Sequence, residues 1–106
     1  MKVVIYTQVY ENYAWNDDGS IGTGGDAYWK AKGGHEYVIK NLDPLKTAPG
    51  LLVDSVRSQV ESDNDYFREY ILDWELVADD YLTEFERSQL EYEGKIEHPA
   101  KELTWA

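Results

Sequence analysis

Residues 3–10 are rich in β-branched and aromatic side chains, as is typical of a β-strand. The positions expected to share one face of this strand are Val3, Ile5, Thr7 and Val9. Asparagine, aspartate and glycine interrupt the pattern over residues 11–26. Because these residue types favour turns and irregular backbone, the sequence predicts a first strand followed by a long loop.

Gly33 and Gly34 separate two further strand-like runs, residues 27–32 and 35–42. Paired glycines readily adopt the positive φ angles that a tight turn requires. The pattern therefore predicts a β-hairpin with the two glycines at its turn.

Apolar residues recur at helical spacing after a connection at residues 43–50 that contains two prolines. They are Leu52, Val53, Val56 and Val60, and they predict a short helix that ends near Glu61. The acidic turn at residues 63–65 is expected to stop this helix.

The run from residue 65 to residue 78 has two interpretations. As a strand, it directs Glu69, Asp73, Glu75 and Asp79 outward and Tyr70, Leu72, Trp74, Leu76 and Ala78 inward. As a helix, it gathers Phe67, Tyr70, Ile71, Trp74, Val77, Ala78 and Tyr81 into one stripe, from which Leu72 and Leu76 are left out. The alternation favours the strand.

Thr83 and Glu86 have the spacing of a capping box, which predicts a second helix from Thr83 to about Glu93, ended by Gly94. In the tail, Leu103 and Trp105 alternate as they would in an edge strand. The expected order is β-β-β-α-β-α with a terminal edge strand. This order indicates an α+β fold in which two helices accompany a small antiparallel sheet, in a single domain of 106 residues.

Charge is concentrated in one part of the chain. Thirteen of the 21 acidic residues lie between Glu61 and Glu97, where Arg68, Arg87 and Lys95 are the only bases, so this segment carries −10 of the net charge of −11. Such a field disfavours contact with nucleic acid or anionic lipid and favours a basic partner. The chain has no cysteine for disulfides or thiol chemistry, no signal peptide and no run that could span a bilayer, which is consistent with the cytoplasm.

The acidic strand is the first candidate site. Carboxylates at alternate strand positions stand about 6.6 Å apart, similar to the step between phosphates on a nucleic-acid strand. The residues expected to bind a partner are Glu69, Asp73, Glu75, Asp79, Asp80 and Glu84, with Trp74 and Phe85 anchoring this face to the core. The alternative is an acidic face that only keeps the protein in solution.

The glycine-rich loop, residues 19–26 within the aromatic segment 10–30, is the second candidate site. It lacks the Gly-Lys-Ser/Thr ending of a Walker loop and any GxGxxG pattern. Aromatic residues surround it, however, and these could form a platform for a ligand or a peptide: Tyr10, Tyr13, Trp15, Tyr28 and Trp29.

His35 and His98 could in principle bind a metal or act as a general base, but their spacing matches neither HExxH nor a paired helical site. The chain also has no calcium-loop pattern and no GxSxG elbow. The sequence therefore predicts no catalytic residue, no metal site and no cofactor. A small metal-dependent hydrolase is the enzymatic alternative.

Two segments, residues 8–13 and residues 28–38, resemble small uncharacterised accessory proteins of tailed bacteriophages, with a looser match at residues 82–86 and 89–94. No characterised activity comes with this resemblance. It implies a class of small proteins that bind and inhibit or redirect host machinery, the acidic ones often as nucleic-acid mimics. The expected function is thus a non-enzymatic interaction protein whose acidic face occludes a basic surface of a host protein, within the cytoplasm of an infected bacterium.

Overall fold

The computed structural model describes residues 1–12 and 29–105. Its elements in chain order are β1 (Lys2–Asn12), β2 (Trp29–Ala31), β3 (Glu36–Ile39), α1 (Pro49–Val60), β4 (Ser62–Asp63), β5 (Phe67–Val77), α2 (Glu84–Glu93) and β6 (Lys101–Glu102). The strands form one sheet in the order β4-β5-β1-β3-β6, with β2 also pairing with β1. All pairings are antiparallel except that of β6 with β3. The α+β prediction is confirmed, and the sheet is mixed.

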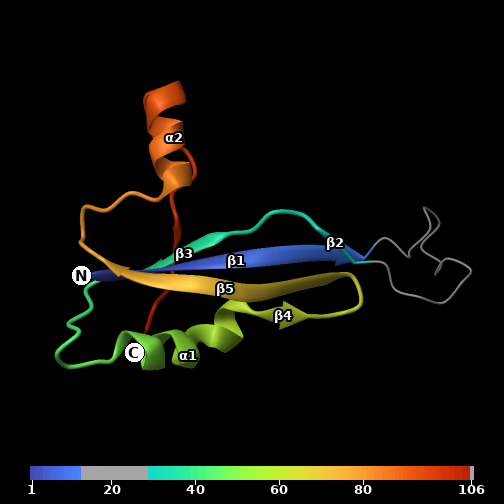
Figure 1. Cartoon of the computed structure of the whole chain (residues 1–106), viewed down its shortest axis with the longest axis horizontal. Helices are drawn as coiled ribbons and strands as arrows, with labels where there is room; N and C mark the ends of the chain where they lie inside the picture. The colour runs from blue at the N-terminus through green and yellow to red at the C-terminus, as the bar shows by residue number, and fades with distance from the viewer. Residues whose placement is uncertain (13–28, 106) are drawn as a thin grey trace, which may run out of the picture.

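The core lies between the sheet and α1. Val3 and Ile5 on β1 are completely buried, and the apolar stripe predicted for α1 packs against them through Leu52, Val53, Val56 and Val60. Removing each such side chain from water contributes about 1.5–3 kcal/mol, so this layer supplies much of the stability. Figure 1 shows α1 along one side of the sheet and α2 projecting away from the other side.

The hairpin predicted around the two glycines is wrong. Both β2 and β3 pair with β1, one after the other along the same side. Between them, Gly33 has a φ angle of 84° and its carbonyl oxygen accepts a hydrogen bond from the N–H of Val9 at 2.7 Å. A Cβ at Gly34 would overlap the carbonyl oxygen of Thr7. The glycines are therefore needed where two backbones approach closely, and they bend the strand without reversing it.

The strand predicted for residues 65–78 is confirmed as β5, but its alternation is broken. Tyr6 of β1 is opposite Asp73 and the next residue, Thr7, is opposite Ile71, so Leu72 is an extra residue in a β-bulge. A one-residue insertion exchanges the faces of all side chains beyond it. Glu69 thus lies on the face of Thr7 and α1, whereas Asp73 and Glu75 lie on the opposite face.

The apolar side of β5 is also less buried than predicted. Leu72 at the bulge is 64% exposed and Trp74 is 37% exposed, and Phe85 at the start of α2 is exposed as well. Trp74 lies opposite Ile5 on the face that α1 covers, and a Cβ built at Gly50 in α1 would lie 3.5 Å from its ring, whereas Phe85 is 54% exposed. Alternation shows which side chains share a face but not how completely another element covers each of them.

The second helix is confirmed, including its capping box and the left-handed Gly94 at its end. The terminal edge strand is confirmed as β6, although it lies at Lys101–Glu102, just before Leu103 and Trp105. The tail is held to α2 by Gln89, whose side chain exchanges two hydrogen bonds with the backbone of His98. No helix in the described part of the chain is both long and apolar enough to cross a membrane.

Candidate functional site

Acidic side chains from three elements line one hollow on the α2 side of the sheet. The hollow, here called the acidic groove, has a volume of about 430 Å³ and is lined by Tyr6, Glu36, Asp73, Glu75, Tyr81, Glu84 and Phe85. Its floor follows from the sheet register, because Tyr6 on the central strand is the cross-strand neighbour of both Asp73 and Glu36. Its wall is formed by the start of α2 and the residues before it.

Tyr6 organises the middle of the acidic groove. Its hydroxyl donates a hydrogen bond to Oε2 of Glu75 at 2.9 Å. Burial raises the pKa of Tyr6, and its hydrogen bonds with Tyr81 and Glu75 raise it further. The phenol therefore remains a hydrogen-bond donor, and it fixes the Glu75 carboxylate at the edge of the groove.

Glu36 connects the groove to α2. Its Oε1 accepts a hydrogen bond from the hydroxyl of Thr83, the N-cap residue of the helix, at 2.7 Å. Burial raises the pKa of Glu36, the Thr83 hydrogen bond opposes that effect, and the charges of Glu86 and Glu84 raise it again. A carboxylate in this position is repelled by its neighbours, and a cation entering the groove would relieve that repulsion.

The structure brings together three of the acids that the sequence singled out, Asp73, Glu75 and Glu84. Asp79 instead forms an ion pair of 3.2 Å with the amino group of Met1, and Asp80 is exposed to solvent. Sequence reasoning did not identify Glu36. The available signal was an acidic residue at the start of a strand whose other three residues are buried.

Glu69 is separated from the other predicted acids by the β-bulge. Its Oε2 accepts hydrogen bonds from the Thr7 hydroxyl at 2.6 Å, the Tyr37 hydroxyl at 2.8 Å and Nδ1 of His35 at 3.0 Å, and its side chain is only 13% exposed. Burial alone would raise the pKa of Glu69, but the hydrogen bonds from Thr7, His35 and Tyr37 outweigh it and lower the pKa. This carboxylate joins β5 to β1 and β3, and it is not presented to a partner.

Two of the five aromatic residues proposed for the alternative ligand site lie in the described part of the chain. The ring of Tyr10 lies 6.3 Å from that of Tyr70, and the guanidinium carbon of Arg68 lies 3.9 Å from the ring centre of Trp29. These contacts hold both rings against β5. The other three, Tyr13, Trp15 and Tyr28, lie outside the described residues, as does most of the predicted glycine-rich loop.

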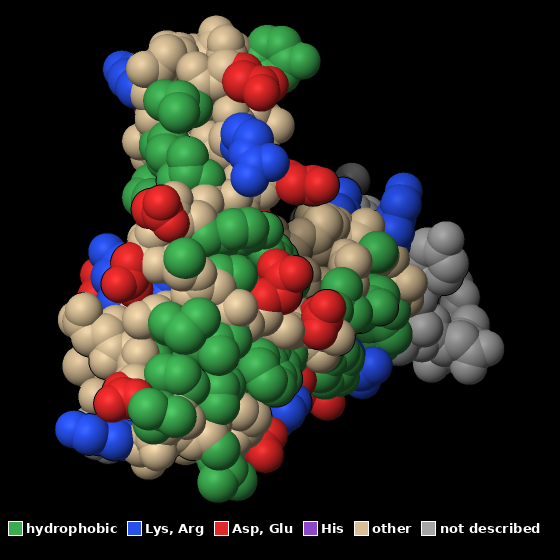
Figure 2. Space-filling model, turned by 60° about the vertical axis from the view of Figure 1, so that its left-hand side comes forward, with side chains coloured by type: hydrophobic (Ala, Val, Ile, Leu, Met, Phe, Trp, Pro, Cys, Tyr) green, Lys and Arg blue, Asp and Glu red, His purple; other side chains and the backbone are tan. Residues whose placement is uncertain are grey.

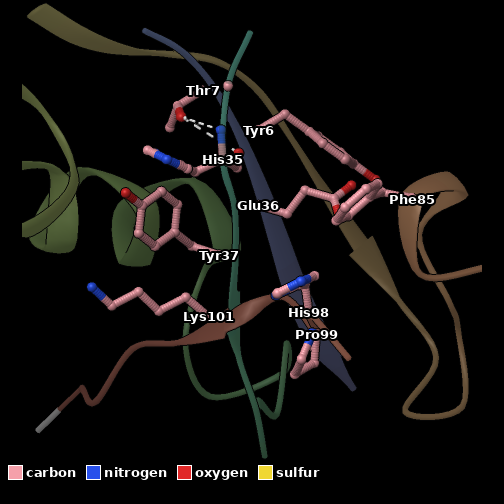
Figure 3. Close-up of a pocket in the computed structure, with 10 residues that line it drawn as sticks. Tyr6, Thr7, His35, Glu36, Tyr37, Phe85, His98, Pro99 and Lys101 are labelled. Carbon is pink, nitrogen blue, oxygen red and sulfur yellow. Dashed lines mark hydrogen bonds between the residues drawn. The ribbon is translucent and has the colours of Figure 1, made fainter. Parts of the chain in front are cut away.

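A second hollow adjoins the acidic groove at the outer edge of β3. This edge cleft has a volume of about 540 Å³ and shares Tyr6, Glu36 and Phe85 with the groove. Figure 3 shows that His35, Tyr37 and Lys101 lie on one side of β3 and that Tyr6, Glu36 and Phe85 lie on the other. His98 and Pro99 come from the tail that runs beside the strand.

Within the described residues, no group of three or more histidine, aspartate or glutamate side chains is arranged to hold a metal ion. Comparison with protein families, with curated proteins and with solved structures finds no match for this chain. What the site does is therefore inferred from its own geometry and charge.

Proposed function

We propose that this protein is a non-enzymatic interaction protein of the bacteriophage type, whose acidic groove and neighbouring acids occlude a basic surface of a host protein. The observation that carries the proposal is the convergence of Glu36, Asp73, Glu75 and Glu84 on one hollow. Like charges that line one hollow repel one another, and a basic side chain from a partner would offset that repulsion.

The aromatic members of the groove suit the same partner. Tyr6, Tyr81 and Phe85 line it together with the carboxylates. A lysine or arginine side chain has an apolar stem and a cationic head, and aromatic faces attract such a head by about 0.5–2 kcal/mol. Arginine fits best, because its planar guanidinium both stacks on rings and forms paired hydrogen bonds with carboxylates.

The surface around the groove favours a partner that is partly apolar. Figure 2 shows acidic side chains separated by hydrophobic ones on the face that it displays. The β-bulge reduces the predicted row of carboxylates on β5 to Asp73 and Glu75. A basic protein surface with apolar residues between its charges, such as one that binds nucleic acid, complements this arrangement. An extended imitation of a phosphate backbone would instead need a longer, unbroken row of carboxylates.

The test is capture of partners from a bacterial lysate at low and at high salt, with identification by mass spectrometry. Binding should weaken steeply with salt, because exposed charge pairs are screened. The double variant Asp73→Lys/Glu75→Lys should abolish capture while circular dichroism shows a retained fold. The matched control is Glu91→Lys/Glu93→Lys, which makes the same charge change on α2 at residues that do not line the groove. Capture that is insensitive to salt, or lost equally in both variants, would contradict the proposal.

The alternative is a ligand- or peptide-binding domain that uses the aromatic, glycine-rich loop, in which the acidic segment serves only solubility. The observation that favours it is that Tyr10 and Trp29 are held in place by contacts with Tyr70 and Arg68. Tyr13→Ala and Trp15→Ala separate the two proposals. They should remove binding if the loop is the site and leave it nearly unchanged if the acidic groove is.

A further inference from the structure

The chain has only two histidines, and the edge cleft brings both of them together with Lys101. His35 precedes β3 and His98 precedes β6, so only the fold brings them to one cleft, where they lie on opposite sides of β3. In a protein of net charge −11, a hollow lined by three side chains that can carry positive charge is unexpected. The proposed partner surface makes no use of these residues.

His35 is held in a defined orientation. Its Nδ1 lies 3.0 Å from Oε2 of Glu69. Because hydrogen bonding keeps Glu69 ionised, that carboxylate can only accept, so Nδ1 carries the proton. The rest of the ring is open to solvent, as the side chain is 60% exposed, and Nε2 is the nitrogen left to meet a ligand.

His98 is positioned through its backbone. Its N–H donates to Oε1 of Gln89 at 2.7 Å, and its carbonyl oxygen accepts from Nε2 of Gln89 at 2.9 Å. Gln89 is only 7% exposed, so its two hydrogen bonds hold the backbone of His98 in a fixed position at the cleft. The side chain of His98 then lies at the cleft between Lys101 and Phe85 (Figure 3).

The cleft has two chemically different sides. His35 and Lys101 lie on the side of β3 opposite Glu36, whose carboxylate is engaged by Thr83. Phe85 and Pro99 supply apolar walls. Its volume of about 540 Å³ is that of a typical small-molecule site, and such sites combine apolar walls with a few fixed polar groups.

We propose that the edge cleft binds a small carboxylate with an aromatic body. The carboxylate lies on the side of Lys101 and His35, away from Glu36, and the body crosses the edge of β3 past His98 to pack against Phe85. Charged hydrogen bonds orient the anion, and the aromatic ring accounts for most of the apolar area buried.

The proposal is tested by titrating the protein with 3-phenylpropionate at pH 6 and following the imidazole C–H signals of the two histidines by NMR. Both signals should move along one saturation curve. Acetate provides the charge without the body, and 3-phenylpropan-1-ol provides the body without the charge. Each should bind at least tenfold more weakly than 3-phenylpropionate.

Variants connect the binding to the cleft. Lys101→Gln and Phe85→Ala should each weaken 3-phenylpropionate at least fivefold, whereas Lys46→Gln, which removes an exposed lysine from the connection before α1, should not. Equal binding of the alcohol or of acetate would overturn the proposal. Different midpoints for the two histidines would do so as well, because they would indicate separate weak contacts and no shared site.

Discussion

At the scale of single residues, the buried polar groups have defined hydrogen-bond partners that connect separate elements of the fold. Glu69 joins strands through three donors that converge on one oxygen. Glu36 and Thr83 join the sheet to a helix through one hydrogen bond. Removing one partner from such a contact leaves the other unsatisfied away from water, which costs more than the bond itself contributes.

Glu69→Gln is therefore expected to lower the free energy of unfolding by about 1–3 kcal/mol at pH 7. Because the folded-state pKa of Glu69 is lowered, its contribution is fully present above the unfolded-state value of about 4.3 and is lost as the pH falls through the folded value. The stability difference between wild type and variant, measured by urea denaturation, should thus shrink below pH 4. A difference that stays constant from pH 7 to pH 3 would show that the carboxylate charge is not what matters.

The two glycines give a second test at this scale. Gly34→Ala places a Cβ on the carbonyl oxygen of Thr7, so the two strands must move apart. Gly33→Ala meets no neighbouring atom and only strains a backbone with a φ angle of 84°, at a cost of about 1–2 kcal/mol. Thermal unfolding should therefore show the larger loss for Gly34→Ala. The reverse order would mean that the glycines act through backbone freedom, as a hairpin turn would require.

At the scale of elements, local signals were read correctly from the sequence and pairings were not. The capping box at Thr83 and the apolar spacing within α1 involve neighbours along the chain, and both helices follow from them. The bulge at Leu72 becomes apparent only when β5 is paired with β1. The bend at Gly33 likewise becomes apparent only when β3 is paired with β1. Glu36 joins Asp73 through two strand pairings, so no pattern within one segment could assign it to the site.

Thr83→Ala tests how α2 is attached. The substitution removes the N-cap, which costs about 1–2 kcal/mol, and also the hydrogen bond to Glu36. Amide hydrogen exchange should accelerate in α2 and leave α1 unchanged. Ser88→Ala, at an exposed position on the same helix, is the control and should not accelerate exchange. If α1 exchanged faster as well, α2 would be part of one cooperative unit with the core and not an arm held at its base.

At the scale of the whole molecule, neutralising carboxylates in a site built of like charges should stabilise the folded protein. Asp73→Asn/Glu75→Gln keeps the hydrogen-bond acceptors for Trp74 and Tyr6 but relieves repulsion in the acidic groove. We expect this variant to melt about 2–4 °C higher than wild type at low salt, with the gain falling at high salt, and to lose affinity for the basic partner. Asp54→Asn is the opposite control, because Asp54 pairs with Arg57 at 3.2 Å and its neutralisation should not raise the melting temperature. Calorimetry at 20 mM and 500 mM salt decides the point. A groove variant that melts lower than wild type at both would mean that these carboxylates stabilise the fold, and the case for a surface kept acidic for binding would fail.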